Sequence, residues 1–217
     1  MSAAGSTEPT DDRAALVRQA FRLEYMTLAW MTIEAAVAIG SGVTTNSLTL
    51  TAFGIDSLIE LASAGVLLWH LTVELRHGQT FAENAERTAS LIGGALLFVL
   101  AAYVVASAAW KFWTQQGAEF SLLGLTVSVL AIPIMYFLAR GKLQLANALG
   151  SRALRADAVE SITCGWLAFV VVAALVAQLL VGAWWVDPLA SLGIVWFAIR
   201  EGREAWQGED CCDQHCK

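Results

Sequence analysis

The sequence predicts an all-α membrane protein made of six transmembrane helices packed as a bundle. Of its 217 residues, 57% are hydrophobic and only 15% are charged, whereas soluble domains carry about 25% charged residues. The mean hydropathy is +0.59. The apolar residues fall into six long segments separated by short polar stretches. We therefore expect a transmembrane domain over residues 21–206, between an N-terminal tail (1–20) and a C-terminal tail (207–217).

The first three membrane segments are expected over residues 23–43, 48–75 and 88–110. A run of Gly, Ser, Thr and Asn between the first two predicts a tight turn. The third segment contains no charged residue and is long enough to cross a bilayer. The polar residues 76–87 are expected to form the loop that precedes it.

The last three membrane segments are expected over residues 120–139, 154–181 and 188–206. Pro133 predicts a kink in the fourth, which neighbouring helices can accommodate. Residues 140–153 are expected to form a small basic loop or the start of the fifth helix. Pro188 is favourable at the first position of a helix, and Asp187 before it is expected to be its N-cap. The sixth segment is short for a full span, because charged residues follow its first twelve or so positions.

The distribution of basic residues predicts the orientation in the membrane. With six spans both termini lie on the same side. Of the 13 Lys and Arg residues, Lys111 falls on the opposite side, and all the others fall on the side of the termini. Basic residues favour the cytoplasmic side, so both termini are expected in the cytoplasm, in a plasma membrane or a bacterial inner membrane. Trp110, Trp113, Trp184 and Trp185 cluster at the opposite ends, as interfacial aromatic residues do.

Two short motifs inside these segments carry matched pairs of possible metal ligands: Asp56-Ser-Leu-Ile-Glu60 and Glu160-Ser-Ile-Thr-Cys164. Residues four apart share one face of a helix. Ionisable groups are costly in a bilayer and are usually functional there. Both pairs reach the middle of a hydrocarbon core about 30 Å thick, and four ligands suit a tetrahedral divalent metal site. The alternative is that these residues are polar contacts between helices and bind no metal.

The charge of this predicted site suggests a mechanism. Three carboxylates and one thiolate carry four negative charges, whereas a divalent cation supplies two positive charges. In a medium of low dielectric the empty site cannot stay fully ionised, so some of the groups are expected to hold protons. Metal binding then releases protons, and protonation releases the metal. The site therefore predicts metal/proton antiport.

Two further acids lie near the predicted site. Glu34, in the middle of the first segment, is expected either to support the ligands or proton path, or to hydrogen-bond to a neighbouring helix. Asp157 lies one turn before Glu160. It is expected to attract cations at the cytoplasmic mouth or to pair with Arg152 or Arg155.

At these residues the chain resembles the cation diffusion facilitators, a family of six-helix, usually dimeric metal efflux proteins. Gly54-Ile-Asp56-Ser-Leu-Ile-Glu60 is similar to the family's acidic pair on the second helix, with Glu in the second place. Leu154-Arg-Ala-Asp157-Ala-Val-Glu160-Ser-Ile-Thr-Cys164 fits its frame on the fifth helix, with Glu for His and Cys for Asp. The resemblance covers residues 15–205. The cytoplasmic metal-binding domain that normally follows the sixth helix is not expected here.

The resemblance implies a divalent metal efflux transporter, and the ligand set indicates zinc or cadmium, because thiolate favours soft ions and carboxylate hard ones. We expect a homodimer formed through the membrane part. We expect the metal ion and protons as substrates, no permanently bound cofactor and no nucleic-acid partner. The alternative is a metal-binding accessory or sensor protein of the same fold that does not transport. An intramembrane enzyme is not expected, since no second His or Ser constellation accompanies Glu160 and Cys164.

The C-terminal tail is rich in soft metal ligands. Cys211, Cys212, His215 and Cys216 fall within six residues, which predicts a flexible arm that captures metal and passes it to the membrane site. The alternatives are a dispensable tail or a site of cysteine acylation.

Overall fold

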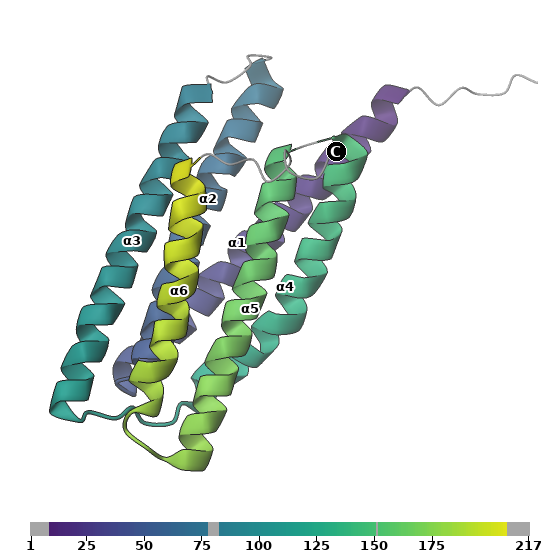
Figure 1. Ribbon diagram of the computed structural model, residues 1–217. Coiled ribbons are helices and arrows are strands. Elements are labelled where there is room, and N and C mark those ends of the chain that lie inside the picture. The colour runs from purple at the N-terminus through teal and green to yellow at the C-terminus, as the bar shows by residue number, and fades with distance from the viewer. Residues whose placement is uncertain (1–8, 78–82, 151, 208–217) are drawn as a thin grey trace, which may run out of the picture.

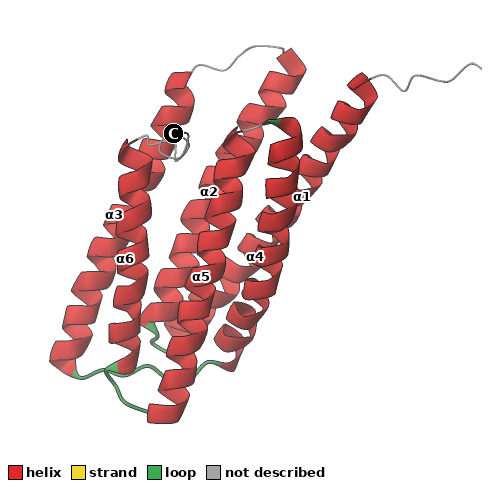
Figure 2. Ribbon diagram, turned by 45° about the vertical axis from the view of Figure 1, so that its right-hand side comes forward, coloured by secondary structure: helices red, strands yellow, loops and turns green. Residues whose placement is uncertain are grey.

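The structure, a computed structural model, describes residues 9–77, 83–150 and 152–207, and in these ranges it is a bundle of six α-helices without strands (Figures 1 and 2). In chain order they are α1 (Pro9–Thr44), α2 (Leu48–His77), α3 (Glu83–Thr114), α4 (Leu122–Leu149), α5 (Arg152–Val181) and α6 (Val186–Gln207). The predicted fold class, an all-α bundle of six helices, is confirmed.

Local sequence signals explain where several helices begin and end. Asn46 has a φ of 53° in the turn between α1 and α2, a conformation that Asn tolerates better than most residues. The Ser121 hydroxyl caps the start of α4 by accepting a hydrogen bond from Gly124 N at 3.0 Å. Gly150 ends α4 with a φ of 65°, where a glycine is favoured. The turn that composition predicted between α1 and α2 is therefore explained by the conformation of Asn46.

Several helices extend beyond their predicted limits. Residues 76–87 were expected to form a loop, but α2 continues to His77 and α3 begins at Glu83. α1 begins at Pro9 rather than near residue 21, and α4 continues to Leu149. Residues 140–149 were expected to form a basic loop or the start of the fifth helix, and this prediction is wrong. They continue the fourth helix, because their aliphatic residues bury one side of it: Leu145 and Ala146 pack with Ala20 and Leu154 in a second small core. Lys142 consequently lies within a helix.

The helices run alternately up and down, so that α1 begins and α6 ends at the same end of the bundle (Figure 1). The largest helix contacts are α4 with α5, α1 with α2 and α3 with α6, and α2 also packs against α3, α5 and α6. Gly54 allows α1 and α2 to approach closely, because a Cβ at this position would lie 2.6 Å from Ile39 Cγ1. α2 is thus the helix around which most of the others pack.

Four of the helices are long and apolar enough to cross a membrane within the described residues: the spans are Ala15–Thr44, Leu91–Thr114, Leu122–Leu149 and Asp157–Val181. α6 does not reach this standard, because charged residues, among them Arg200 and Glu201, interrupt its apolar stretch. Several side chains of α2 lie outside the described residues, and its described part carries Asp56 and Glu60. Acids also lie within the spans of other helices, since Glu34 belongs to the α1 span and Glu160 to the α5 span.

Candidate metal centre

The acidic pair of α2 is buried and only partly hydrogen-bonded. Asp56 is 1% exposed and Glu60 is 8% exposed. Both carboxylate oxygens of Asp56 and Oε1 of Glu60 have no hydrogen-bond partner among the residues that the structure describes. Buried polar groups are nearly always paired, since an unpaired one costs free energy. These carboxylates are therefore candidates for binding a cation or a proton.

The second pair, on α5, is divided between two environments. Cys164 is fully buried, and the charged groups that its thiol faces are Glu60, Glu34 and Asp56. Glu160 is exposed. It lines a small cavity together with Glu60 and Asp157. One predicted ligand from each of the two helices, Glu60 of α2 and Glu160 of α5, thus borders this cavity.

The four predicted ligands surround the contact between α2 and α5, but they do not converge on one point. In the described parts of the chain, no group of three or more His, Cys, Asp or Glu side chains is arranged to hold a metal ion. Coordination of one ion by Asp56, Glu60, Glu160 and Cys164 therefore requires movement of side chains or helices.

Glu34 connects three helices around the pair on α2. Its side chain is fully buried. Oε1 accepts hydrogen bonds from Ser57 Oγ of α2 at 2.8 Å and from the Cys164 thiol of α5 at 3.6 Å. Oε2 accepts one from Trp30 Nε1 of α1 at 2.7 Å. The predicted hydrogen bond to a neighbouring helix is present, and Glu34 orients residues next to Asp56 and Glu60. A role in a proton path stays a prediction.

Asp157 pairs with a residue that was expected in a basic loop or at the start of the fifth helix. Its carboxylate contacts Lys142 Nζ of α4, and the same ammonium lies 3.3 Å from Glu24 Oε2 of α1. The expected partner Arg152 has a side chain outside the described residues, and among the described residues Asp157 pairs with Lys142 of a neighbouring helix and not with Arg155. The extension of α4 to Leu149 explains the difference, because it carries Lys142 to the level of Asp157.

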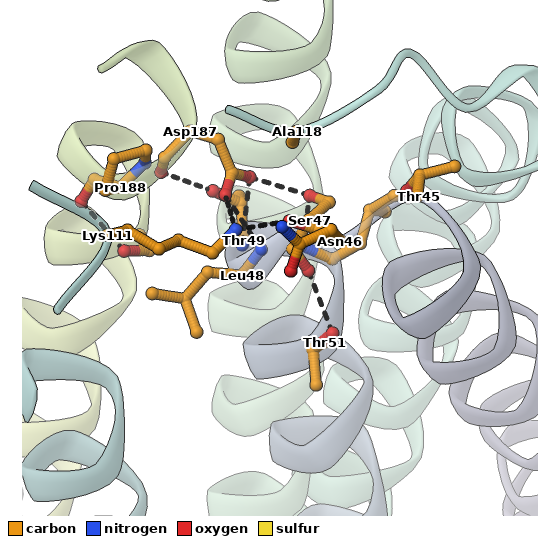
Figure 3. A network of polar contacts seen from close by, with 12 residues as sticks. Thr45, Asn46, Ser47, Leu48, Thr49, Thr51, Lys111, Ala118, Asp187 and Pro188 are labelled. Atoms are coloured by element: carbon orange, nitrogen blue, oxygen red, sulfur yellow. Dashed lines mark hydrogen bonds and ion pairs between the residues drawn. The ribbon is translucent and has the colours of Figure 1, made fainter. Parts of the chain in front are cut away.

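A polar network at the end opposite the termini holds the start of α2 (Figure 3). Asp187 accepts hydrogen bonds from Ser47 Oγ at 2.7 Å and from the backbone nitrogens of Leu48 at 2.8 Å and Thr49 at 3.2 Å. Lys111 Nζ of α3 lies 3.3 Å from the same carboxylate and also donates to Asn46 O.

Asp187 was expected to cap α6, and this prediction is wrong. The residue lies in the first turn of α6, which begins at Val186, and its side chain caps α2 instead. A carboxylate at a helix N-terminus satisfies free N–H groups and interacts favourably with the helix dipole. Asp187 thereby fixes the position of the helix that carries Asp56 and Glu60.

Sequence reasoning missed one further acid. Glu201 of α6 lies close enough to Asp56, Glu60 and Glu160 to repel their carboxylates. It lies in the charged last part of the sixth segment, where an acid is also common as a solvated residue, so the sequence contained no signal for it. The predicted metal-capturing residues Cys211, Cys212, His215 and Cys216 lie outside the described residues.

Comparison with known proteins agrees with this architecture. Residues 26–206 match the cation efflux transmembrane domain. An uncharacterized transporter of Synechocystis sp. is 31% identical over 176 residues, which make up 76% of this chain and 56% of that protein. The chain thus aligns with little more than half the length of this relative.

A six-helix bundle with acids buried between its helices, matching this domain over most of its length, is a cation efflux transmembrane domain. The chain belongs to the cation diffusion facilitator family. The resemblance seen in the sequence is confirmed.

Proposed function

We propose that this chain exports a divalent metal ion, zinc or cadmium, from the cytoplasm in exchange for protons, and that Asp56, Glu60, Glu160 and Cys164 bind the ion. The observation that carries the proposal is the pair of buried carboxylates on α2. Three of their four oxygens have no hydrogen-bond partner among the described residues. Such groups favour a bound cation or proton over an empty site.

The position of α5 supports the choice of the other two ligands. α5 packs against α2, Cys164 faces the acids of α2, and Glu160 shares a cavity with Glu60. A modest displacement of one helix against the other gathers the ligands around one ion. Transporters bind and release their substrates through such movements.

Exchange for protons follows from the ligand chemistry. Carboxylates and thiols bind metal in their deprotonated forms, so metal binding releases protons and protonation expels the metal. The excess of basic residues near the termini supports an orientation with both termini in the cytoplasm. We also propose that the protein acts as a homodimer formed through the membrane helices, as the family resemblance implies.

One observation favours a second candidate, a metal-binding accessory or sensor protein that does not transport. The four ligands do not converge on one point within the described residues. A site that binds metal only weakly, or in one conformation only, suits a sensor as well as a transporter. Measuring flux separates the two, because both proteins bind metal.

The test is metal uptake into inside-out membrane vesicles with an imposed pH gradient, using zinc, cadmium and manganese in parallel. We expect gradient-driven uptake of zinc or cadmium by the wild type and its loss in Asp56→Asn. Glu119→Gln is the matched control, because this carboxylate is exposed in the loop before α4. Wild-type protein that binds metal but takes up no ion would overturn the transporter and favour the accessory protein.

A further inference from the structure

A lysine is buried between two carboxylates in the half of the bundle nearest the termini. Lys142 of α4 has no exposed surface. Its ammonium lies 3.3 Å from Glu24 Oε2 of α1 and also contacts Asp157 of α5. Glu24 and Asp157 are themselves 4% and 5% exposed. The three side chains form one buried cluster, which we term the Lys142 cluster.

The Lys142 cluster carries more negative than positive charge. Two carboxylates surround one ammonium, and Oε1 of Glu24 has no hydrogen-bond partner among the described residues. Among the described residues, the ammonium also lies 3.4 Å from the Ser161 hydroxyl. In an ion pair whose hydrogen bonds are all made, every buried carboxylate oxygen would have a hydrogen-bond partner. The cluster is therefore built for more positive charge than Lys142 supplies.

The Lys142 cluster is continuous with the candidate metal centre. Asp157 and Ser161 line the same small cavity as Glu60 and Glu160. A cation held by Asp157 is therefore next to two of the proposed ligands. Glu24 lies near the middle of the long helix α1, Asp157 early in α5 and Lys142 late in α4, so all three lie between the end that carries the termini and the α2 pair.

Structural stabilisation alone is a weak explanation for this arrangement. Removing charges from water is expensive, and replacing a buried ion pair by neutral groups of similar shape is often neutral or stabilising. A lysine ammonium is also a mobile charge on a flexible stem, which suits a group that moves aside.

We propose that Glu24 and Asp157 form a second cation site, that the ammonium of Lys142 occupies it at rest, and that a divalent metal ion displaces this ammonium on its way to Glu60 and Glu160. The inference rests on the proposed transport function for the direction of travel, but not for the binding itself. Lys142 acts as a built-in competitor that keeps the acidic path filled when no metal is present.

The first experiment measures binding of cadmium alone by equilibrium dialysis of purified full-length protein in detergent, comparing the wild type with Lys142→Met. Without the competing ammonium, the half-saturating cadmium concentration is expected to fall about tenfold or more, because charge interactions are strong in a medium of low dielectric. Lys142→Arg keeps the charge and is expected to bind like the wild type. Unchanged cadmium binding by folded Lys142→Met would overturn the proposal.

A second variant keeps the proposal testable if Lys142→Met does not fold. Glu24→Gln, Lys142→Met and Asp157→Asn combined remove all three charges and leave no buried charge unpaired. In vesicle uptake this triple variant is expected to raise KM several-fold while kcat stays within about twofold of the wild type. If the triple variant has the same KM and the same kcat as the wild type, the cluster only stabilises the fold.

The two proposals fail in different ways. If the wild type binds cadmium but no vesicle takes up metal, the transport function fails, while the binding difference between wild type and Lys142→Met still decides the role of the cluster. If transport occurs and neither variant changes binding or KM, the second cation site fails alone. If neither wild type nor Lys142→Met binds cadmium, the second site is also wrong.

Discussion

The thiol of Cys164 on α5 lies 3.6 Å from Glu34 Oε1 on α1, and the same oxygen accepts a hydrogen bond from Ser57 on α2 at 2.8 Å. A single buried carboxylate oxygen therefore joins the two ligand-bearing helices. Displacing Cys164 toward a metal ion breaks its bond to Glu34 but leaves the bond to Ser57. The sulfur can thus join the acids of α2 without disturbing the helix that carries them.

Replacing the sulfur should change which ion is preferred. In Cys164→Ser the hydroxyl still donates to Glu34, so the fold is expected to persist, but the soft ligand is lost. We expect the ratio of cadmium to zinc uptake to fall about tenfold, because thiolate favours softer ions. Parallel vesicle uptake of both ions measures the ratio. An unchanged ratio would remove Cys164 from the ligand set.

Neutralising Asp56 should separate binding from stability. Neither oxygen of Asp56 has a hydrogen-bond partner in the described residues, so Asp56→Asn removes a poorly satisfied buried acid. We expect metal binding and uptake to be lost, while the Tm stays equal to or above that of the wild type. Thermal unfolding in detergent and cadmium dialysis measure the two effects. A marked fall in Tm would instead give Asp56 a structural role.

Metal affinity should depend on pH in one direction. Protons and metal compete for the same carboxylates and thiol, so lowering the pH weakens metal binding and raising it strengthens metal binding. We expect the half-saturating cadmium concentration to rise as the pH of a dialysis experiment is lowered from about 8 to about 6. Affinity that does not vary with pH in the wild type would contradict proton exchange at this site.

Changes in the network around Asp187 should affect the stability of the fold more than they affect metal binding. Asp187→Ala leaves Lys111 buried without its carboxylate and removes the cap of α2. Breaking a buried pair on one side costs about 3 to 5 kcal/mol, so chemical denaturation should show a large loss of stability.

The conservative control is the combined variant Lys111→Met with Asp187→Asn, which leaves no lone charge. It should recover a substantial part of the stability, since the amide oxygen still accepts from the start of α2. Equal stability of Asp187→Ala and the wild type would show that the network of Figure 3 is not needed for folding.

The sequence was sufficient to predict what depends on local periodicity. The spacing of Asp56 and Glu60 placed both on one helix face, and the structure buries both. The six helices follow from six apolar segments, each of which corresponds to one helix. These features depend on residues close together in the chain, so a single sequence contains the information.

Features that depend on long-range contacts could not be predicted in the same way. The extension of α4 rests on packing with α1 and α5, so Lys142 was assigned to a loop or to the start of the fifth helix. Asp187 caps a helix whose start lies about 140 residues earlier in the chain, although its neighbour Pro188 suggested a local cap. Glu201 becomes relevant only because α6 packs against α2. Each of these depends on how the helices pack and not on the residues nearby.

The two buried lysines divide the helices into two sets. Lys111 ties α3 to α6 and, through Asp187, to the start of α2, whereas Lys142 ties α4 to α1 and α5. Asp56 and Glu60 belong to the first set, and Glu160 and Cys164 belong to the second. The two sets are themselves joined, because α1 packs against α2 and Glu34 Oε1 of α1 accepts a hydrogen bond from Ser57 Oγ of α2. A movement of one set against the other would leave Lys111 and Lys142 with their carboxylate partners but would strain this buried hydrogen bond, so Glu34 couples the position of α2 to that of the helix carrying Cys164.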